Sequence, residues 1–471
     1  MKNLFIPIVI GVFLLSCNES ESLQVDQIRI QVNREYALAG QDSILIDAEI
    51  IGPSPAEAEN ITLEYLANGV PLTGPFFLPQ ERGNFELSAR YESTESNRIT
   101  VEVFDLADDI EALNLTYDGY SLLTTHAWSV AGTFTLEGLI GSRSFPISSD
   151  QSTFYANGEP LTSAEGLHFP EAGDYEIVAE VSNIQSNTIQ LKVRPEKAYP
   201  LKTLPVVFHV YSADVNLRDL DRLIDTLNNS FNRQAYATDQ VLSGSVNPNA
   251  VDLFLRFERA QTSPEGVRTD AAGVQIIPAP NGIYSSLTQG RFNNLEEEYG
   301  WDPDEYINIW LADGYEFSFP PFDGSSEGID ARGIVYSPIL ESGSLEGLPS
   351  LEFPDPRNPI GAPEEFSQAI LLRRGSVAGE HPDYIVNRMG FFLGLFDTFE
   401  FSCAKKGDYC ADTFFPDFDQ LTGSIIDKVP SCEGPDFFLN NHMSINRNYT
   451  SFTYDQRERV RFVLENALFR P

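Results

Sequence analysis

The sequence predicts a multidomain protein in which two all-β domains precede one α/β domain. Three observations support this prediction. A segment of the N-terminal part recurs about 90 residues further on, short alternating apolar runs fill both copies, and beyond residue 194 apolar runs alternate with helical periodicity. The chain has 471 residues, of which 42% are hydrophobic, so it is long enough to bury several separate cores.

The internal repeat predicts two similar β-sandwiches. The segment 67–73 recurs at 156–162, and both copies contain Asn-Gly, which is a two-residue hairpin signal. The runs around each copy alternate apolar and polar residues, as strands do. Short strands in a unit of this length are typical of immunoglobulin-type sandwiches. We therefore expect Ig-like sandwiches over residues 24–104 and 105–194, and we interpret them as spacers.

The residues from 198 to 471 predict an α/β domain. A strand is expected over 204–211, and Asn216 is expected to cap a helix whose apolar residues have helical spacing: Leu220, Leu223, Ile224, Leu227 and Phe231. Further elements are strands over 251–257, 306–311 and 333–336, a surface loop over 341–365, and a helix that begins at Pro382. Thr453 and Gln456 form a capping box for the last helix, whose expected buried face is Val460, Val463, Leu464 and Ala467.

The N-terminus predicts export and lipidation. Lys2 precedes an apolar run, Leu4 to Leu15, that is short for a membrane span. The run ends at Leu14-Leu15-Ser16-Cys17, which resembles the lipobox of bacterial lipoproteins. The resemblance implies a signal peptide over 1–17, a lipid on Cys17 and a tether over 18–23. The protein would then be anchored to the outer membrane of the cell envelope, on its periplasmic or its outer face; the alternative is an ordinary secretory signal.

Net charge excludes one class of partner. The chain has 31 Lys and Arg against 69 Asp and Glu, for a formal net charge of −38. Nucleic-acid binding depends on clustered Lys and Arg that neutralise phosphates. We therefore expect no nucleic-acid partner.

Residues 387–397 have the spacing of a zinc-peptidase helix without its ligands. On the metzincin pattern H-E-x-x-H-x-x-G-x-x-H, Gly394 occupies the glycine position, while the three ligand positions hold Asn387, Phe391 and Asp397. The general-base position holds Arg388. A phenylalanine ring has no lone pair to donate, and arginine is permanently protonated. Catalytic zinc needs three protein ligands and an open position, so we expect no metal, no cofactor and no catalytic residue here.

The order of the surrounding segments resembles the pappalysin (cytophagalysin) family of metzincin peptidases. The segments that carry the resemblance are 205–210, the helix after it, 306–311, 333–335, Gly407 to Thr413, and Asn441 to Ser444. The resemblance implies a metzincin-like fold, a Met-turn at Met443 and, for active relatives, zinc as the cofactor.

Three cysteines remain after Cys17. The resemblance implies a disulfide between Cys403 and Cys432, with Cys410 as the odd thiol. The competing pairing joins Cys403 to Cys410 and leaves Cys432 free.

The other candidate metal ligands are the histidines and the nearby carboxylates. The histidines are His126, His168, His209, His381 and His442. We interpret His381 as an exposed residue just before the helix and assign no ligand role to the others. Asp408 and Asp412 could supply oxygen ligands to calcium, and a polar loop is an equally good interpretation.

The sequence supports three functional hypotheses. In the first, a lipid-anchored protein uses a metzincin-like domain without zinc ligands or general base for non-catalytic binding or scaffolding of a peptide, protein or glycan. In the second, it is a zinc metalloendopeptidase with relocated ligands, such as Asp397 and an outlying histidine. In the third, it is an adhesin that acts through the Ig-like domains. The sequence leaves open whether the former cleft is open or filled.

Overall fold

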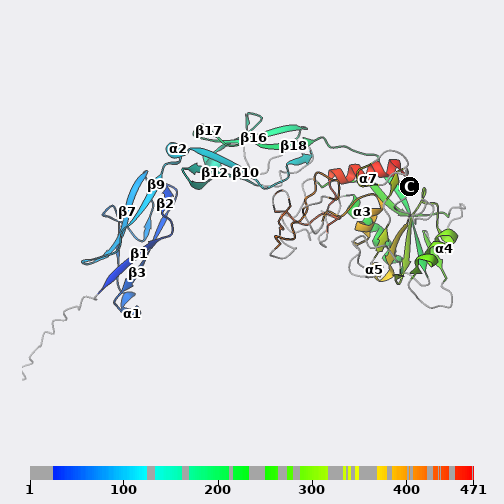
Figure 1. Ribbon diagram of the computed structural model, residues 1–471, viewed down its shortest axis with the longest axis horizontal. Helices are drawn as coiled ribbons and strands as arrows, with labels where there is room; N and C mark the ends of the chain where they lie inside the picture. The colour runs from blue at the N-terminus through cyan, green and yellow to red at the C-terminus, as the bar shows by residue number, and fades with distance from the viewer. Residues whose placement is uncertain are drawn as a thin grey trace, which may run out of the picture. The chain divides into compact units, whose positions relative to one another are not determined.

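The computed structural model describes most of the chain, in two compact units (Figure 1). The described residues are 25–124, 133–161, 169–211, 216–232, 250–263, 273–278, 287–316, 333–335, 338–340, 345–348, 369–378, 384–399, 403, 407–421, 428–432, 434, 436–444, 451–468 and 470–471. The first unit comprises Met1–Asn114, Glu137–Ile147 and Glu180–Gln185, and the second comprises Leu115–Leu136, Ser148–Ala179 and Ser186–Pro471. Among the described residues, no helix is both long and apolar enough to cross a membrane.

Cys17, His126, His168, His381, Pro382 and most of the predicted loop lie outside the described residues.

The first repeat contains two sheets. One sheet has the strand order β1 (Gln27–Val32), β3 (Ile44–Ile51), β6 (Phe76–Phe77). The other has the order β2 (Tyr36–Leu38), β9 (Ile99–Phe104), β7 (Gly83–Tyr91), β4 (Glu64–Ala67), β5 (Val70–Pro71), with β8 (Thr94–Glu95) paired to β7. Inward side chains of both sheets, such as Ile30, Leu87 and Val101, form one core. Short helices α1 (Pro55–Ala58) and α2 (Leu106–Asp109) complete this region.

The larger sheet of the second repeat has the same strand order as that of the first. This larger sheet has the order β11 (Leu122–Thr124), β18 (Ile189–Arg194), β16 (Gly173–Val181), β14 (Thr153–Ala156), β15 (Glu159–Pro160), with β17 (Ile184–Gln185) paired to β16. The smaller sheet has the order β10 (Ala112–Tyr117), β12 (Phe134–Ile140), β13 (Arg143–Ile147). The smaller sheets differ in their third strand, because β6 follows β5 in the first repeat whereas β13 precedes β14 in the second. The 3₁₀ turn η1 (Ser149–Gln151) lies between β13 and β14.

An asparagine makes the same pair of hydrogen bonds in each repeat. The side chain of Asn97 accepts from the backbone N–H of Ile30 and donates to the carbonyl of the same residue, at 2.8 and 3.2 Å. The side chain of Asn187 makes both bonds to Leu115, at 2.7 and 2.9 Å. The hairpins β4–β5 and β14–β15 both turn at an Asn-Gly pair whose two residues are in the left-handed backbone region, as the sequence predicts.

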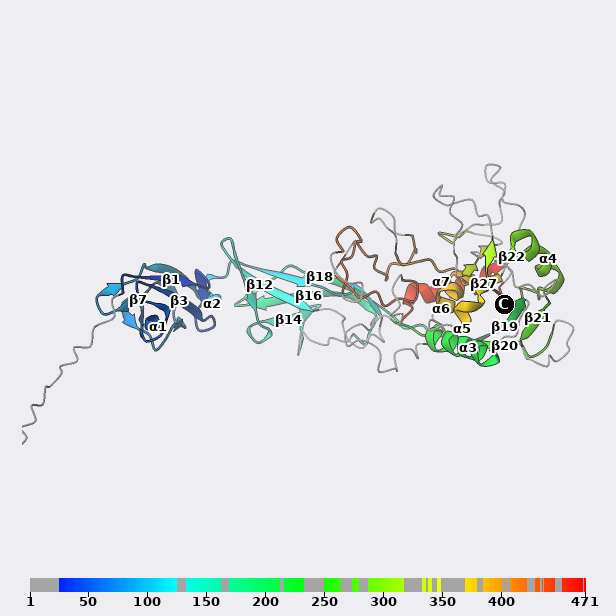
Figure 2. The ribbon, with the colours of Figure 1, turned by 90° about the horizontal axis from the view of Figure 1, so that it is seen from below.

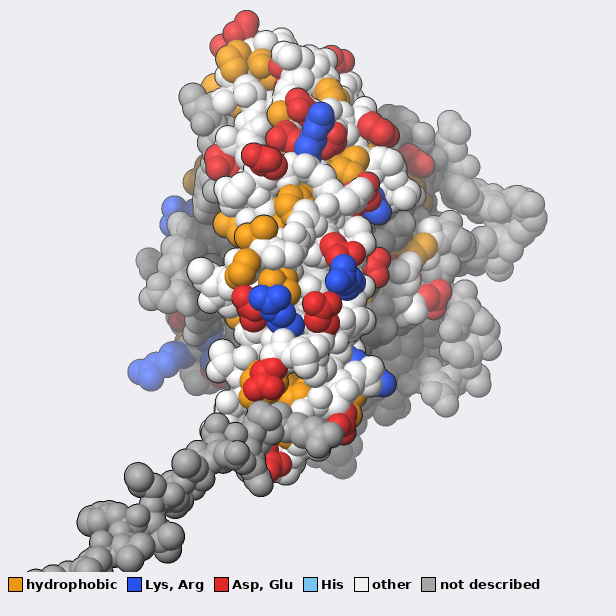
Figure 3. Space-filling view, turned by 90° about the vertical axis from the view of Figure 1, so that its left-hand side faces the viewer, with side chains coloured by type: hydrophobic (Ala, Val, Ile, Leu, Met, Phe, Trp, Pro, Cys, Tyr) orange, Lys and Arg blue, Asp and Glu red, His pale blue; other side chains and the backbone are white. Residues whose placement is uncertain are grey.

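One face of the molecule shows how the charge is distributed. Acidic side chains are spread over the face in Figure 3, with fewer basic side chains between them. This mixture fits a solvated acidic surface.

A mixed sheet forms the centre of the C-terminal region. Its strand order is β20 (Leu255–Arg259), β19 (Lys202–Tyr211), β23 (Ile307–Ala312), β27 (Ala369–Arg373), β25 (Gly333–Val335), and β21 (Val274–Ile277) also pairs with β19. Strands β20, β21 and β23 run parallel to β19, and β27 runs parallel to β23, whereas β25 is antiparallel to β27. All six residues of β23 are buried, because both faces of the sheet are covered.

Helices cover the two faces of this sheet (Figure 2). The helices α3 (Leu217–Phe231), α6 (Tyr384–Phe392) and α7 (Tyr454–Asn466) share a core with one face. Helix α4 (Gln289–Tyr299) packs against the other face through Phe292 and Trp310. The remaining elements are α5 (Arg374–Ala378), β22 (Leu287–Thr288), β24 (Tyr315–Glu316), β26 (Ile339–Leu340) and β28 (Ala467–Leu468).

Both predicted helix caps are confirmed. The side chain of Asn216 accepts from the backbone of Arg218 at the start of α3, and Thr453 and Gln456 form the capping box of α7. Two predicted boundaries were wrong. The strand expected over 251–257 begins only at Leu255, and Ala467, expected on the buried face of α7, is half-buried in β28.

Candidate functional site

Met443 lies directly against the degenerate helix α6. A Cβ atom added to Gly390 would be 2.4 Å from the Met443 sulfur, so only glycine leaves room for it. The backbone of Met443 is held on both sides: its N–H donates to the Asn441 side chain at 2.8 Å, and its carbonyl accepts from Thr398 at 2.9 Å. Asn387 Nδ2 lies 3.9 Å from the same sulfur. The structure therefore brings together the helix and the segment expected to be the Met-turn.

Gly394 turns the chain back at the end of α6. Its φ of +88° is in the left-handed region, and a Cβ there would lie 2.6 Å from Val463 Cγ2. The turn brings Asp397 back beside α6, where Asn387 Nδ2 lies 3.4 Å from Asp397 Oδ1. The first and third ligand positions of the pattern are thus neighbours in space.

Two arginines bind the carbonyl groups at the end of α6. Arg459 Nε donates to the Gly394 carbonyl at 2.6 Å, and Arg470 Nε donates to the Phe392 carbonyl at 2.7 Å. Cations at the C-terminal end of a helix satisfy free carbonyls and oppose the negative end of the helix dipole. We predicted neither arginine from the sequence, because the pattern of α7 marks only its apolar face and Arg470 lies beyond the end of this helix.

Asp397 is mostly enclosed. Burial raises the pKa of its carboxyl to about 6, against the smaller lowering effects of the Asn387 hydrogen bond and the Arg388 charge. The carboxylate is therefore close to its titration point near neutral pH.

Arg388 is stacked between two aromatic rings of the same helix. Its guanidinium carbon lies 4.7 Å from the ring centre of Tyr384 and 5.1 Å from that of Phe391. Its Nε atom is buried without a hydrogen-bond partner, and none of the described carboxylates forms an ion pair with it. The residue at the general-base position is a fixed cation.

The residues present do not fit a zinc ion. The Asn387 amide points its NH₂ group at Asp397 Oδ1 and the His442 carbonyl, Phe391 offers no donor atom, and only Asp397 has a carboxylate. Within the part of the chain that the structure describes, no three His, Cys, Asp or Glu side chains gather in a group suited to a metal.

The two described histidines are buried in the fold. His209 on β19 is hydrogen-bonded to Gln275 and Asn308 and stacked on Trp310 with ring centres 4.5 Å apart. Burial lowers its pKa to about 4. The ring of His442 packs on Phe452 at 4.7 Å, and burial lowers its pKa to about 3.

Asp408 and Asp412 are bonded to protein donors. Asp412 is fully buried and accepts from Arg194 Nη2 at 2.8 Å, from Thr453 Oγ1 at 2.6 Å and from a backbone N–H of α7. Asp408 accepts from the backbone of Cys410 at 3.2 Å. Arg194 supplies the positive charge for this cluster. No local pattern in the sequence marks it for this role.

The structure contains the disulfide that the resemblance implied. Cys403 is bonded to Cys432, and Cys410 is free and buried. The competing pairing of Cys403 with Cys410 is absent from these described residues.

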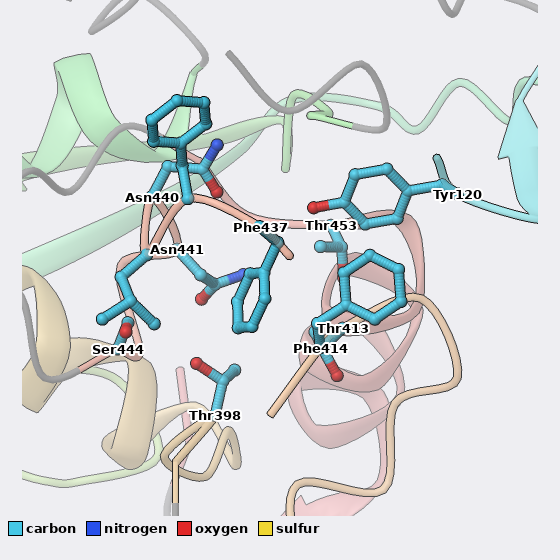
Figure 4. A pocket seen from close by; sticks show the side chains of 11 residues that line it. Tyr120, Thr398, Thr413, Phe414, Phe437, Asn440, Asn441, Ser444 and Thr453 are labelled. Atoms are coloured by element: carbon cyan, nitrogen blue, oxygen red, sulfur yellow. The ribbon is translucent and has the colours of Figure 1, made fainter. Parts of the chain in front are cut away.

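A small pocket lies beside the segment around Met443 (Figure 4). Its lining residues are Tyr120, Thr398, Thr413, Phe414, Phe437, Phe438, Leu439, Asn440, Asn441, Ser444 and Thr453. Its volume of about 10 Å³ suits one water molecule. The Ser444 hydroxyl is buried there without a hydrogen-bond partner.

A comparison with known families shows what the segment around α6 and Met443 is similar to. Residues 362–465 match the peptidase family model described as Pregnancy-associated plasma protein-A. This segment is pappalysin-like. The match contains α6, Gly394 and Met443, so the pappalysin resemblance of the sequence is confirmed. A search of curated proteins finds no match to the chain.

Three solved structures match parts of the chain at low sequence identity. Mature mirolysin of Tannerella forsythia in complex with a cleaved peptide is 19% identical, with a TM-score of 0.37, covering 56% of this chain and 92% of that one. The Ig domains 1–5 of Sidekick-1 are 14% identical, with a TM-score of 0.16, covering 40% and 43%. The Yersinia pseudotuberculosis adhesin InvE is 10% identical, with a TM-score of 0.16, covering 35% and 58%.

Proposed function

We propose that this protein is a lipid-anchored, non-catalytic binding protein whose pappalysin-like domain holds an extended peptide without cleaving it. The observation that carries the proposal is the presence of Arg388 and Phe391 at motif positions beside Gly394 and Met443, which keep the places of the peptidase pattern. Zinc-dependent hydrolysis needs a metal-bound water and a base that accepts its proton. A permanently protonated guanidinium and an apolar ring provide neither.

Contacts within the protein keep the shape of the site. Met443 packs against Gly390, the two arginines bind the end of α6, and the disulfide closes the neighbouring loop. In an active relative, zinc would also join the helix to the segment that carries the third ligand. Here the frame has protein contacts in its place, which favours a retained binding role over a collapsed site.

The sheet offers a place for a peptide backbone. Strand β25 is at one end of the C-terminal sheet and, among the described strands, pairs only with β27. An end strand presents free N–H and C=O groups, and an extended peptide can add to it as one more strand. A peptide is therefore the preferred ligand of the three classes that the sequence left open.

The decisive test is zinc content. Elemental analysis of the purified chain should find no stoichiometric zinc, and the chain should cleave no peptide. The matched variant Asn387→His with Arg388→Glu and Phe391→His should gain zinc, with Asp397 as the third ligand. Stoichiometric zinc in the unchanged chain, or chelator-sensitive cleavage by it, would establish a peptidase with relocated ligands instead.

The anchor is tested separately. Replacing Cys17 by Ala should move the protein from the membrane fraction to the soluble fraction and abolish labelling with a radioactive fatty acid. Unchanged fractionation and labelling would contradict lipidation at Cys17. Cell adhesion that persists after deletion of residues 195–471 would favour the adhesin hypothesis.

A further inference from the structure

We propose that Arg388 is the receptor for a carboxylate of the bound peptide, and specifically for its C-terminal carboxylate. The inference rests on the proposed peptide-binding function and adds the chemistry of the ligand. It is derived from the stacking of Arg388, from the absence of an ion pair between Arg388 and any described carboxylate, and from its place in the motif.

The guanidinium is held in a fixed orientation. Tyr384 and Phe391 lie one on each side in the sequence of α6, and both rings contact the Arg388 guanidinium. Stacked guanidinium groups lose little further freedom when they bind, and their donors match the two oxygens of a carboxylate. The Arg388 side chain therefore loses little additional conformational entropy when a ligand binds.

The guanidinium forms no ion pair with a described carboxylate, although the charge of Asp397 acts on it from beyond ion-pair distance. No carboxylate of the described residues pairs with Arg388, and its Nε has no hydrogen-bond partner. The contrast with Arg194 is informative, because Arg194 is paired with Asp412 and Asp455. In a chain of net charge −38, an arginine that forms no ion pair within the described part of the structure is a specific point of attraction for an anionic group.

The position of Arg388 in the motif indicates which carboxylate of a peptide it would bind. In the H-E-x-x-H pattern the glutamate acts on the water that attacks the scissile carbonyl, so this position faces the reacting carbonyl group. A peptide that ends there presents a carboxylate in place of that carbonyl. A glutamate would repel the carboxylate, whereas Arg388 attracts it.

Three mixtures of fluorescein-labelled octapeptides test the proposal with the full chain in detergent. The first is randomised without Asp and Glu and has a free C-terminal carboxylate. The second is identical but ends in a carboxamide. The third is a carboxamide mixture that includes Glu, so it separates a side-chain carboxylate from the chain end. Binding is measured by fluorescence anisotropy.

We expect the first mixture to bind at least about tenfold more tightly than the second, the scale of one charge-assisted hydrogen-bonded pair. Arg388→Gln should remove the difference, and Arg388→Lys should keep part of it because the charge remains. Arg256→Gln, at an exposed ion pair on β20, is the matched control and should change nothing. Circular dichroism checks that each variant is folded.

The remaining outcomes separate the two proposals. Equal binding of the first two mixtures, or a preference that survives Arg388→Gln, overturns the carboxylate receptor while leaving peptide binding in place. Binding of the third mixture as tight as the first overturns the assignment to the chain end and assigns the carboxylate to side chains. Absence of binding by all three mixtures overturns the peptide-binding function itself.

Discussion

The sulfur of Met443 occupies the space that a side chain at Gly390 would need. The added Cβ would approach it to 2.4 Å, closer than real contacts of this kind. The same sulfur lies 3.9 Å from Asn387 Nδ2, so one methionine contacts the helix at two positions a turn apart. The distance between α6 and the segment around Met443 is therefore set by side-chain packing.

Replacing Gly390 by Ala should destabilise the protein by about 1–3 kcal/mol, the usual cost of overpacking a filled core. Chemical denaturation measures the change. Gly290→Ala on α4 is the matched control, because a Cβ there meets no atom within 4 Å and alanine favours helix. Equal effects of the two substitutions would contradict the close contact with Met443.

Replacing Arg194 by Ala should destabilise the protein by about 3–5 kcal/mol, because it leaves the fully buried Asp412 without its cation. Arg194 also stacks on Tyr454, with its guanidinium carbon 4.1 Å from the ring centre. The control is Arg98→Ala, which removes an exposed ion pair with Glu86 and should have a much smaller effect. A small effect at both positions would show that Asp412 is satisfied without Arg194.

Replacing Asp397 by Asn should stabilise the protein at about pH 8, by the order of 2 kcal/mol, and have little effect at about pH 4. The pKa of Asp397 is raised from 3.8 to about 6, so the folded state holds a proton that the unfolded state has lost between these values. Stability from this group is present below pH 3.8 and is lost as the pH rises through about 6. Denaturation curves across this range test the sign, and a difference that does not vary with pH would contradict it.

Reducing the disulfide between Cys403 and Cys432 should lower the free energy of unfolding by about 3–4 kcal/mol, because a loop with a sequence separation of 29 is no longer closed in the unfolded state. Cys410 is buried, and burial raises the pKa of its thiol. It should therefore resist alkylation in the native protein and react on unfolding.

Peptide mapping of the non-reduced protein tests which cysteines are paired. A crosslinked peptide that holds Cys403 and Cys410 together, with Cys432 alkylated, would contradict the pairing of Cys403 with Cys432.

Local signals in the sequence predicted local structure well. The helix cap at Asn216 and the capping box at Thr453 depend on residues only two or three positions away, and both are present. The contact between Met443 and α6 followed from a motif order and is also present. In each case the relevant partner was near in sequence or implied by a recognised segment.

Long-range partners could not be predicted in the same way. Arg459 and Gly394 are 65 positions apart, and Arg194 and Asp412 are 218 apart. Polar residues on a helix normally indicate a solvated face, so nothing local marked Arg459 as buried. Only the tertiary fold decides which carbonyl or carboxylate a guanidinium meets.

The arginines at the end of α6 separate two tasks that a metal performs together in a zinc peptidase. There, one ion both activates its bound water and fastens two segments, so a lost ligand disables the chemistry and loosens the fold at once. Here Arg459 and Arg470 fasten the helix through backbone carbonyls, whose identity no substitution at positions 387, 388 or 391 alters. The attachment of this end of the helix is consequently separate from the chemistry of the motif positions, so the ligand that the site accepts can change while the helix stays in place.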